Sequence, residues 1–172
     1  MPQPPGLPVA SALPMTAGAP KRTRDAILLA LAATPDDLAR VTKDRSVDDL
    51  LSPSRDGGWG VVEVLAHLHD WEEVFLERLN QTVDEVHPFL AVQDDELWPI
   101  ERDYRGQVPA RTLERFRDLR GQTLAFLSGL SVEGWDRGAN HGIYGEVTIL
   151  WLADHICDHD AEHIEQARDA LA

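Results

Sequence analysis

Residues 146–171 read EVTILWLADHICDHDAEHIEQARDAL, and this stretch decides the expected fold of the chain. Its apolar side chains recur three and four residues apart, which is the period of an amphipathic α-helix. They form one buried face, made of Leu150, Ala153, Ile156, Cys157, Ile164, Ala167 and Leu171. The pattern predicts a long helix that packs against other helices.

Three other segments carry the same helical period, at residues 24–44, 61–83 and 110–130. No segment alternates convincingly with the period of two that indicates a β-strand. Pro35 interrupts the first segment, so either one helix is kinked there or a second helix begins. Four long helical segments without strands predict an all-α fold, a four-helix bundle.

The remaining residues are expected to connect these helices. Residues 46–54 predict a short helical turn, residues 134–145 are turn-rich, and residues 84–109 predict a long irregular connection with room for one helical turn. Residues 1–20 are proline-rich and show no period, which indicates a mobile N-terminal arm. Met15 is an alternative start. Residues 21–172 are then expected to form one domain.

Composition argues against several classes of partner. The formal net charge of −14 disfavours nucleic acids and anionic membranes, because both are bound through clustered Lys and Arg. No apolar run approaches the ~20 residues of a transmembrane helix. The N-terminus also lacks the pattern of a signal peptide. The single cysteine, Cys157, excludes an intrachain disulfide. We therefore expect a soluble cytoplasmic protein.

Three of the seven histidines lie in the last predicted helix, at His155, His159 and His163. Residues four apart form a slanted row along a helix, because each residue turns by about 100°. His163 lies nearest the centre of the buried face, His159 lies at its edge, and His155 lies roughly 80° further round, toward solvent. His159 and His163 are thus the pair expected to point inward, where two imidazoles can share one metal ion. The same spacing also occurs in histidines without a metal.

A metal held by these two histidines needs a third ligand from another helix. Residues 61–83 offer His67 and His69, which flank opposite edges of the apolar stripe of that helix. The helical wheel does not choose between them.

Two carboxylates fall near the middle of buried stripes, Glu72 in the second long helix and Asp160 in the last. An unpaired carboxylate is costly in such a position. Both are candidates to orient metal-bound histidines by accepting the second ring N–H. The alternative is a buried hydrogen bond from Trp59 or from a loop backbone.

Two stretches resemble the signature motifs of the DinB-like superfamily. WGVVEVLAHLHDWEEVFLERL has a Trp before a "vlaHl" element and then "dwE", and YGEVTILWLADHICDHDAEHIEQARDAL has the element "HD.eH..Q". The resemblance covers about residues 22–172 and implies a four-helix bundle with a divalent metal at one end. Matched motif to motif, it implies the ligands His67, His159 and His163, and it implies that His155 is not a ligand. Gly60 departs from the family pattern, which usually has Ser or Thr there.

The resemblance also implies a homodimer, and some relatives use low-molecular-weight thiols such as bacillithiol or mycothiol. Three neutral imidazoles suit Zn²⁺, Ni²⁺ or Fe²⁺ and leave the charge of the ion uncompensated, so a bound water or thiol is activated. We expect a metal-dependent transferase that joins such a thiol to a small electrophile. The alternatives are a metal-dependent hydrolase and a non-catalytic, metal-binding, stress-related bundle.

Two further expectations concern the surroundings of the metal. The substrate is expected to enter at the bundle end near His67, beside residues 84–109, where Trp98 and Tyr104 are possible lining residues or surface packing. Cys157 lies on the buried stripe and is expected to be a core residue and not the nucleophile.

Overall fold

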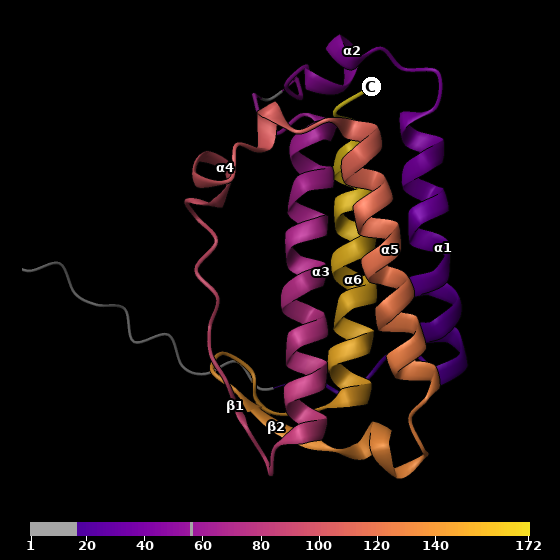
Figure 1. Ribbon diagram of the computed structural model, residues 1–172, viewed down its shortest axis with the longest axis vertical. Coiled ribbons are helices and arrows are strands. Elements are labelled where there is room, and N and C mark those ends of the chain that lie inside the picture. The colour runs from indigo at the N-terminus through magenta and orange to yellow at the C-terminus, as the bar shows by residue number, and fades with distance from the viewer. Residues whose placement is uncertain (1–16, 56) are drawn as a thin grey trace, which may run out of the picture.

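A computed structural model describes residues 17–55 and 57–172 of the protein. Within these residues, four long helices form a bundle (Figure 1). They are α1 Arg24–Thr42, α3 Val61–Asp84, α5 Pro109–Ser128 and α6 Ile149–Asp169. The predicted four-helix fold is confirmed. The first helix is continuous through Pro35, so no second helix begins there.

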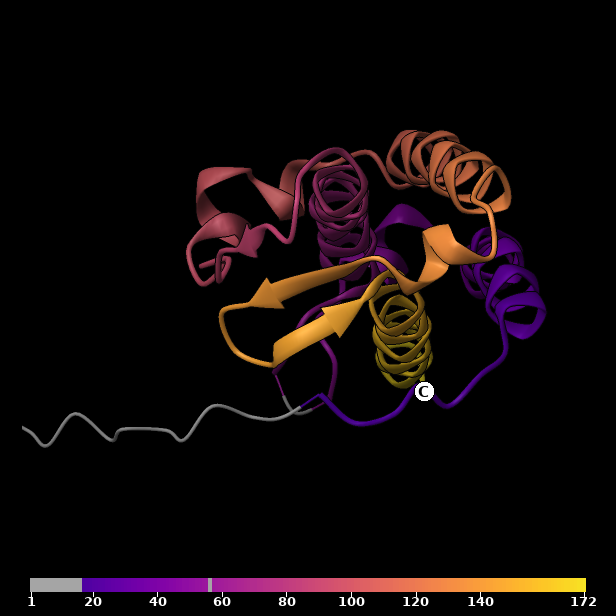
Figure 2. The same ribbon diagram turned by 90° about the horizontal axis from the view of Figure 1, so that it is seen from below.

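The four helices do not follow one another around the bundle. α1 packs against α5 and α6, and α3 packs against the same two helices (Figure 2). The order around the bundle is therefore α1, α5, α3, α6. Figure 1 shows that α1 and α6 run in one direction and that α3 and α5 run in the other. The helix pair α3 and α6, which will carry the candidate site, is thus antiparallel and adjacent.

A long return segment, residues 85–108, joins the parallel helices α3 and α5. The 24 residues of α3 span about 36 Å, so the chain must travel the length of the bundle before α5 can begin. The segment does this along one side of the bundle (Figure 1). It contains the short elements β1 Phe89–Leu90, α4 Trp98–Glu101 and the 3-10 turn η1 Tyr104–Gly106. The predicted irregular connection with one short helix is confirmed.

The expectation that the chain has no strands is wrong at one end of the bundle. In the described part of the chain, β1 pairs in parallel with β2 Gly138–His141, which pairs antiparallel with β3 Gly145–Thr148. These strands are two to four residues long, too short for an alternation to stand out in sequence. α6 consequently begins at Ile149 and not at Glu146. Thr148 caps it by accepting the N–H of Trp151.

The loop before α3 explains the glycine at its N-cap. The short helix α2 Val47–Leu51, predicted within residues 46–54, precedes this loop. A Cβ atom on Gly60 would lie 2.7 Å from the carbonyl oxygen of Ser52, closer than such atoms approach. Gly60 has no side chain to cap the helix, but the other half of a capping box is present, because the carboxylate of Glu63 accepts the backbone N–H of Gly60 at 2.9 Å.

Two of the apolar clusters among the described residues fill the space between the long helices. One lies toward the sheet and includes Ile27, Leu31, Phe75, Leu79, Leu127 and Ile156. The other lies toward α2 and includes Leu38, Val61, Leu65, Leu68, Phe116 and Ile164. Between them each long helix contributes a polar residue to one layer, namely Thr34, Glu72, Arg120 and Asp160.

The expected N-terminal arm falls mostly on residues outside the described ranges. Its described part, residues 17–20, is held at the turn between β2 and β3, since the backbone N–H of Ala17 donates to the carbonyl of Tyr144 at 3.0 Å. Arg22 follows and pairs with Asp154 and Asp158 on α6. No helix in the described residues has both the length and the apolar character needed to cross a membrane.

Candidate metal centre

Three histidines converge where α3 faces α6. His67 comes from α3, and His159 and His163 come from consecutive turns of α6. The nitrogen atoms that they can offer to a metal lie within 4.8 Å of one another. Nε2 of His67 is 3.3 Å from Nε2 of His159, and the ring centre of His163 is 4.5 Å from both other rings. The structure thus brings together the three residues that the sequence singled out.

The other two histidines of these helices lie elsewhere. His69 is directed to Asp70, whose Oδ1 is 3.0 Å from its Nδ1. His155 is not in the cluster and stacks on Trp151 with the ring planes 10° apart. The expectation that His155 points toward solvent is only partly right, because the rings of Trp151 and Tyr144 cover one side of it.

The spacing of the cluster fits a metal ion. In a tetrahedral site with Zn–N bonds of 2.0–2.1 Å, two ligand nitrogens lie about 3.3–3.4 Å apart. The two Nε2 atoms of His67 and His159 are 3.3 Å apart. Imidazole is also a suitable donor for Zn²⁺, Ni²⁺ and Fe²⁺.

Burial keeps the imidazoles of His67 and His159 neutral, as a metal ligand must be. Burial, together with the nearby His163, lowers the pKa of His67 to about 4. Burial, with His163 and His67 beside it, lowers the pKa of His159 to about 2. Both rings therefore carry a free lone pair at neutral pH.

The outward nitrogens of the triad differ in their surroundings. Nδ1 of His163 lies 2.7 Å from Oε1 of Gln166. This oxygen can accept a hydrogen bond from Nδ1–H, which leaves the lone pair of the ring on Nε2. Nδ1 of His67 lies 4.0 Å from a carboxylate oxygen of Asp95 in the return segment. Nδ1 of His159 is buried and has no hydrogen-bond partner among the described residues. Sequence reasoning missed Gln166 and Asp95, although the position of Gln166 three residues after His163 was a readable signal.

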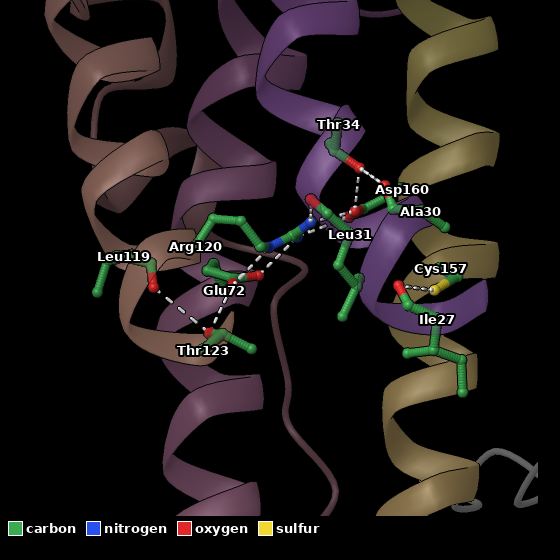
Figure 3. A network of polar contacts seen from close by, with 10 residues as sticks. All are labelled: Ile27, Ala30, Leu31, Thr34, Glu72, Leu119, Arg120, Thr123, Cys157 and Asp160. Carbon is green, nitrogen blue, oxygen red and sulfur yellow. Dashed lines mark hydrogen bonds and ion pairs between the residues drawn. The ribbon is translucent and has the colours of Figure 1, made fainter. Parts of the chain in front are cut away.

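Glu72 and Asp160 do not bond to the histidines, which corrects the expectation that they orient the ligands. Figure 3 shows both carboxylates around the guanidinium of Arg120. Nε and Nη2 of Arg120 donate to Glu72 at 2.9 and 2.8 Å, and Nη1 and Nη2 donate to Asp160 at 2.6 and 3.1 Å. Thr123 donates to Glu72, and Thr34 donates to Asp160. The alternative of a bond from Trp59 or a loop backbone is not observed either.

The Arg120 layer is fully enclosed. The side chains of Arg120 and Glu72 are 1% exposed and that of Asp160 is 4% exposed. Burial raises the pKa of Asp160, although Arg120 opposes the shift. Burial lowers the pKa of Arg120, but Asp160 and Glu72 outweigh this and raise it above its ordinary value. Because the layer lies in the bundle centre, its position fits a structural role.

Pro35 leaves the carbonyl of Leu31 free to accept a hydrogen bond from this layer. A residue at position 35 would normally donate its N–H to the carbonyl of Leu31, but proline has no N–H. The freed carbonyl accepts Nη1 of Arg120 at 3.1 Å (Figure 3). Arg120 on α5 therefore takes the place of the N–H that the proline in α1 lacks.

His163, alone of the triad, lines a hollow of about 500 Å³, together with Gly58, Trp59, Glu162 and Gln166. The approach thus lies between the loop before α3 and the outer face of α6. Trp98 and Tyr104 do not line it, since they are only 6% and 1% exposed. Both pack against α3, and the hydroxyl of Tyr104 donates to Asp70 at 2.9 Å.

Cys157 is a core residue, as predicted. It is buried against α1, with Sγ 3.9 Å from the carbonyl oxygen of Ile27 (Figure 3). Burial raises the pKa of its thiol to about 12. A thiol that stays protonated and covered cannot serve as a nucleophile at neutral pH.

The fold and the triad together define a helical bundle with a candidate metal centre between two antiparallel helices. The chain belongs to the DinB superfamily, whose family model matches residues 30–167.

Two curated relatives share most of its length. The chain is 26% identical over 150 residues to "Putative metal-dependent hydrolase YfiT" of Bacillus subtilis, covering 83% of this chain and 84% of that protein. It is 21% identical over 126 residues to a protein of the same description from Oceanobacillus iheyensis, covering 73% and 72%. The solved structure of YfiT from Bacillus subtilis matches with a TM-score of 0.80 and 24% identity, over 95% of this chain and 93% of that one. This likeness confirms the bundle fold, whose topology is described as unusual in that protein.

Proposed function

We propose that this protein is a metal-dependent enzyme that acts on a small molecule, with the metal held by His67, His159 and His163. The observation that carries the proposal is the convergence of three imidazoles whose closest nitrogens are 3.3 Å apart. Three protein ligands and an adjoining hollow are the pattern of a catalytic site, because structural zinc is normally closed by four protein ligands.

The residues around the triad suit chemistry at an activated nucleophile. When bound, a divalent cation at three neutral imidazoles supplies an uncompensated positive charge that lowers the pKa of a water or a thiol. Gln166 fixes the ring of His163 through Nδ1. Glu162 lines the same hollow as His163, and its carboxylate is our candidate to take up the proton of the nucleophile. Trp59 also lines the hollow, and its ring centre lies 5.0 Å from that of His67.

Hydrolysis is our first candidate reaction. The two curated relatives each carry the description "Putative metal-dependent hydrolase". Water as the nucleophile also requires no further binding site for a second substrate.

Transfer of a low-molecular-weight thiol to a small electrophile is the second candidate. Because Cys157 is buried and protonated, the thiol in this reaction would come from outside the chain. The charge of the metal stabilises a thiolate as well as a hydroxide.

Metal analysis of purified variants tests the proposal. His159→Ala is expected to lose the metal, because two histidines are too few to hold it. His155→Ala is the matched control, since it makes the same change one turn earlier on α6 and is expected to keep the metal. Loss of metal in His155→Ala with full retention in His159→Ala would refute the assignment.

The reaction is tested with metal-loaded protein. A panel of ester, amide and phosphoester substrates reports hydrolysis, and monochlorobimane with bacillithiol, mycothiol or glutathione reports thiol transfer. Turnover is expected to vanish in His159→Ala and to fall by about 10²–10⁴-fold in Glu162→Gln, the range for loss of a general base. Absence of any metal-dependent turnover would leave the non-catalytic bundle as the better description.

A further inference from the structure

A carboxylate of the return segment stands beside the triad. Oδ2 of Asp95 accepts the indole N–H of Trp71 at 2.8 Å and lies 4.0 Å from Nδ1 of His67. Helical side chains lean toward the N-terminus, so Trp71 reaches back over the turn that carries His67. The indole therefore holds the Asp95 carboxylate next to this imidazole.

The two ring nitrogens of His67 have different neighbours. Nε2 faces Nε2 of His159 at 3.3 Å, whereas Nδ1 faces Asp95. A neutral imidazole carries one N–H and one lone pair. A negative charge beside Nδ1 favours the proton on that nitrogen, which leaves the lone pair on Nε2, toward the other two histidines.

We propose that Asp95 is the positioning residue for His67, and that it ties the return segment to the metal centre. The inference rests on the proposed metal site. Metal-binding histidines generally donate their second N–H to a carboxylate, a carbonyl or a water. Glu72 and Asp160 are committed to Arg120, so the carboxylate for His67 comes from outside the bundle.

The remaining gap between Asp95 and His67 is small. A distance of 4.0 Å exceeds a normal N–H···O bond by about 1 Å. The side chain of Asp95 is 37% exposed, and residues 91–95 have no helix or strand. A shift of this short stretch toward α3 closes the gap, so metal binding is expected to draw the return segment onto the bundle.

Three variants test the inference in the full-length protein. Asp95→Ala removes the carboxylate, Asp95→Glu keeps one within reach, and Glu96→Ala is the control because it removes an exposed carboxylate from the adjacent position. Zn²⁺ affinity is measured by competition with a chelator. Asp95→Ala is expected to bind 10–100-fold more weakly, the usual effect of losing such a partner. Asp95→Glu is expected to recover part of this loss, and Glu96→Ala is expected to stay within about twofold of the wild type.

Two further readouts separate positioning from general damage to the fold. Nitrogen-15 NMR of the metal-free protein reports the His67 tautomer, which is expected to be the Nδ1–H form in the wild type and a mixture in Asp95→Ala. Hydrogen exchange of residues 91–97 is expected to slow on Zn²⁺ addition in the wild type but not in Asp95→Ala. Wild-type affinity and an unchanged tautomer in Asp95→Ala overturn this inference alone. A wild-type chain that binds no Zn²⁺ overturns the proposed metal site as well.

Discussion

Replacing Arg120 with methionine tests how the buried polar layer holds the bundle together. The side chain of Arg120 is 1% exposed and bonds to Glu72, Asp160 and the carbonyl of Leu31. Methionine has a similar helix propensity and an unbranched side chain but lacks the guanidinium, so the change removes the cation together with its hydrogen bonds. Two carboxylates then remain enclosed without a counter-charge.

The expected cost is about 3–5 kcal/mol of unfolding free energy at pH 7, the range for removing one partner of a buried ion pair. The pH dependence has a definite sign. Removing Arg120 takes away the interaction that opposes the raised pKa of Asp160, so the folded variant binds a proton there more tightly than the unfolded chain does. Its stability deficit relative to wild type should therefore be largest near pH 7 and shrink as the pH falls toward about 4.

The assay is urea unfolding of metal-free protein, followed by far-ultraviolet circular dichroism. Arg117→Met is the control on the same helix, because Arg117 is 52% exposed and pairs with the exposed Asp36. It should cost less than about 1 kcal/mol. Apolar replacement of all three charges, with Glu72→Met and Asp160→Leu added to Arg120→Met, should recover much of the loss. A cost for Arg120→Met no larger than that of Arg117→Met contradicts the reasoning.

Four further outcomes are expected. Burial, with Arg78 nearby, lowers the pKa of His141 to about 4. At this residue the folded state therefore binds fewer protons than the unfolded state, so the protein loses stability as the pH falls from about 6.5 to about 4. His141→Asn should reduce this loss in unfolding titrations, because Asn cannot be protonated. A chain that begins at Lys21 should have a melting temperature within a few degrees of the full-length protein, since it loses the hydrogen bond of Ala17 but keeps the ion pairs of Arg22. A large drop of the melting temperature in calorimetry would contradict this. Cys157 should react with a thiol reagent only after unfolding, and fast reaction of native protein would disprove its burial. A homodimer remains our proposal, and sedimentation should give twice the mass of the chain.

The helices were predictable because each is long enough for its apolar period to repeat several times. The three strands were not, since none exceeds four residues and β1 pairs with a strand nearly fifty residues away. The order of the helices around the bundle was also hidden. It depends on the path of the return segment, residues 85–108, which carries no periodic pattern.

Within the site, His159 and His163 followed from their place on the α6 stripe, and His67 was separated from His69 only by the resemblance to a family. Arg120 left a signal that was missed, because it lies on the apolar face of α5 between Phe116 and Leu127. A cation there could have been matched to the buried carboxylates of two other helices. Asp95 could not be recognised in the sequence, since its position beside the triad depends on the irregular path of the return segment and on the hydrogen bond from Trp71.

Pro35 joins two helices through a single oxygen atom. Any other residue at this position would bring a second N–H to the carbonyl of Leu31, which already accepts Arg120. The usual gain of about 3 kcal/mol on replacing a proline inside a helix should therefore be smaller here, because two donors would share one acceptor. The effects of changing Pro35 and Arg120 should not add, so the pair behaves as one energetic unit although 85 positions of sequence separate its members. The proline thus makes the contact between α1 and α5 possible. Replacing it would make the hydrogen bonding of α1 more regular and would weaken the bond from Arg120 to Leu31.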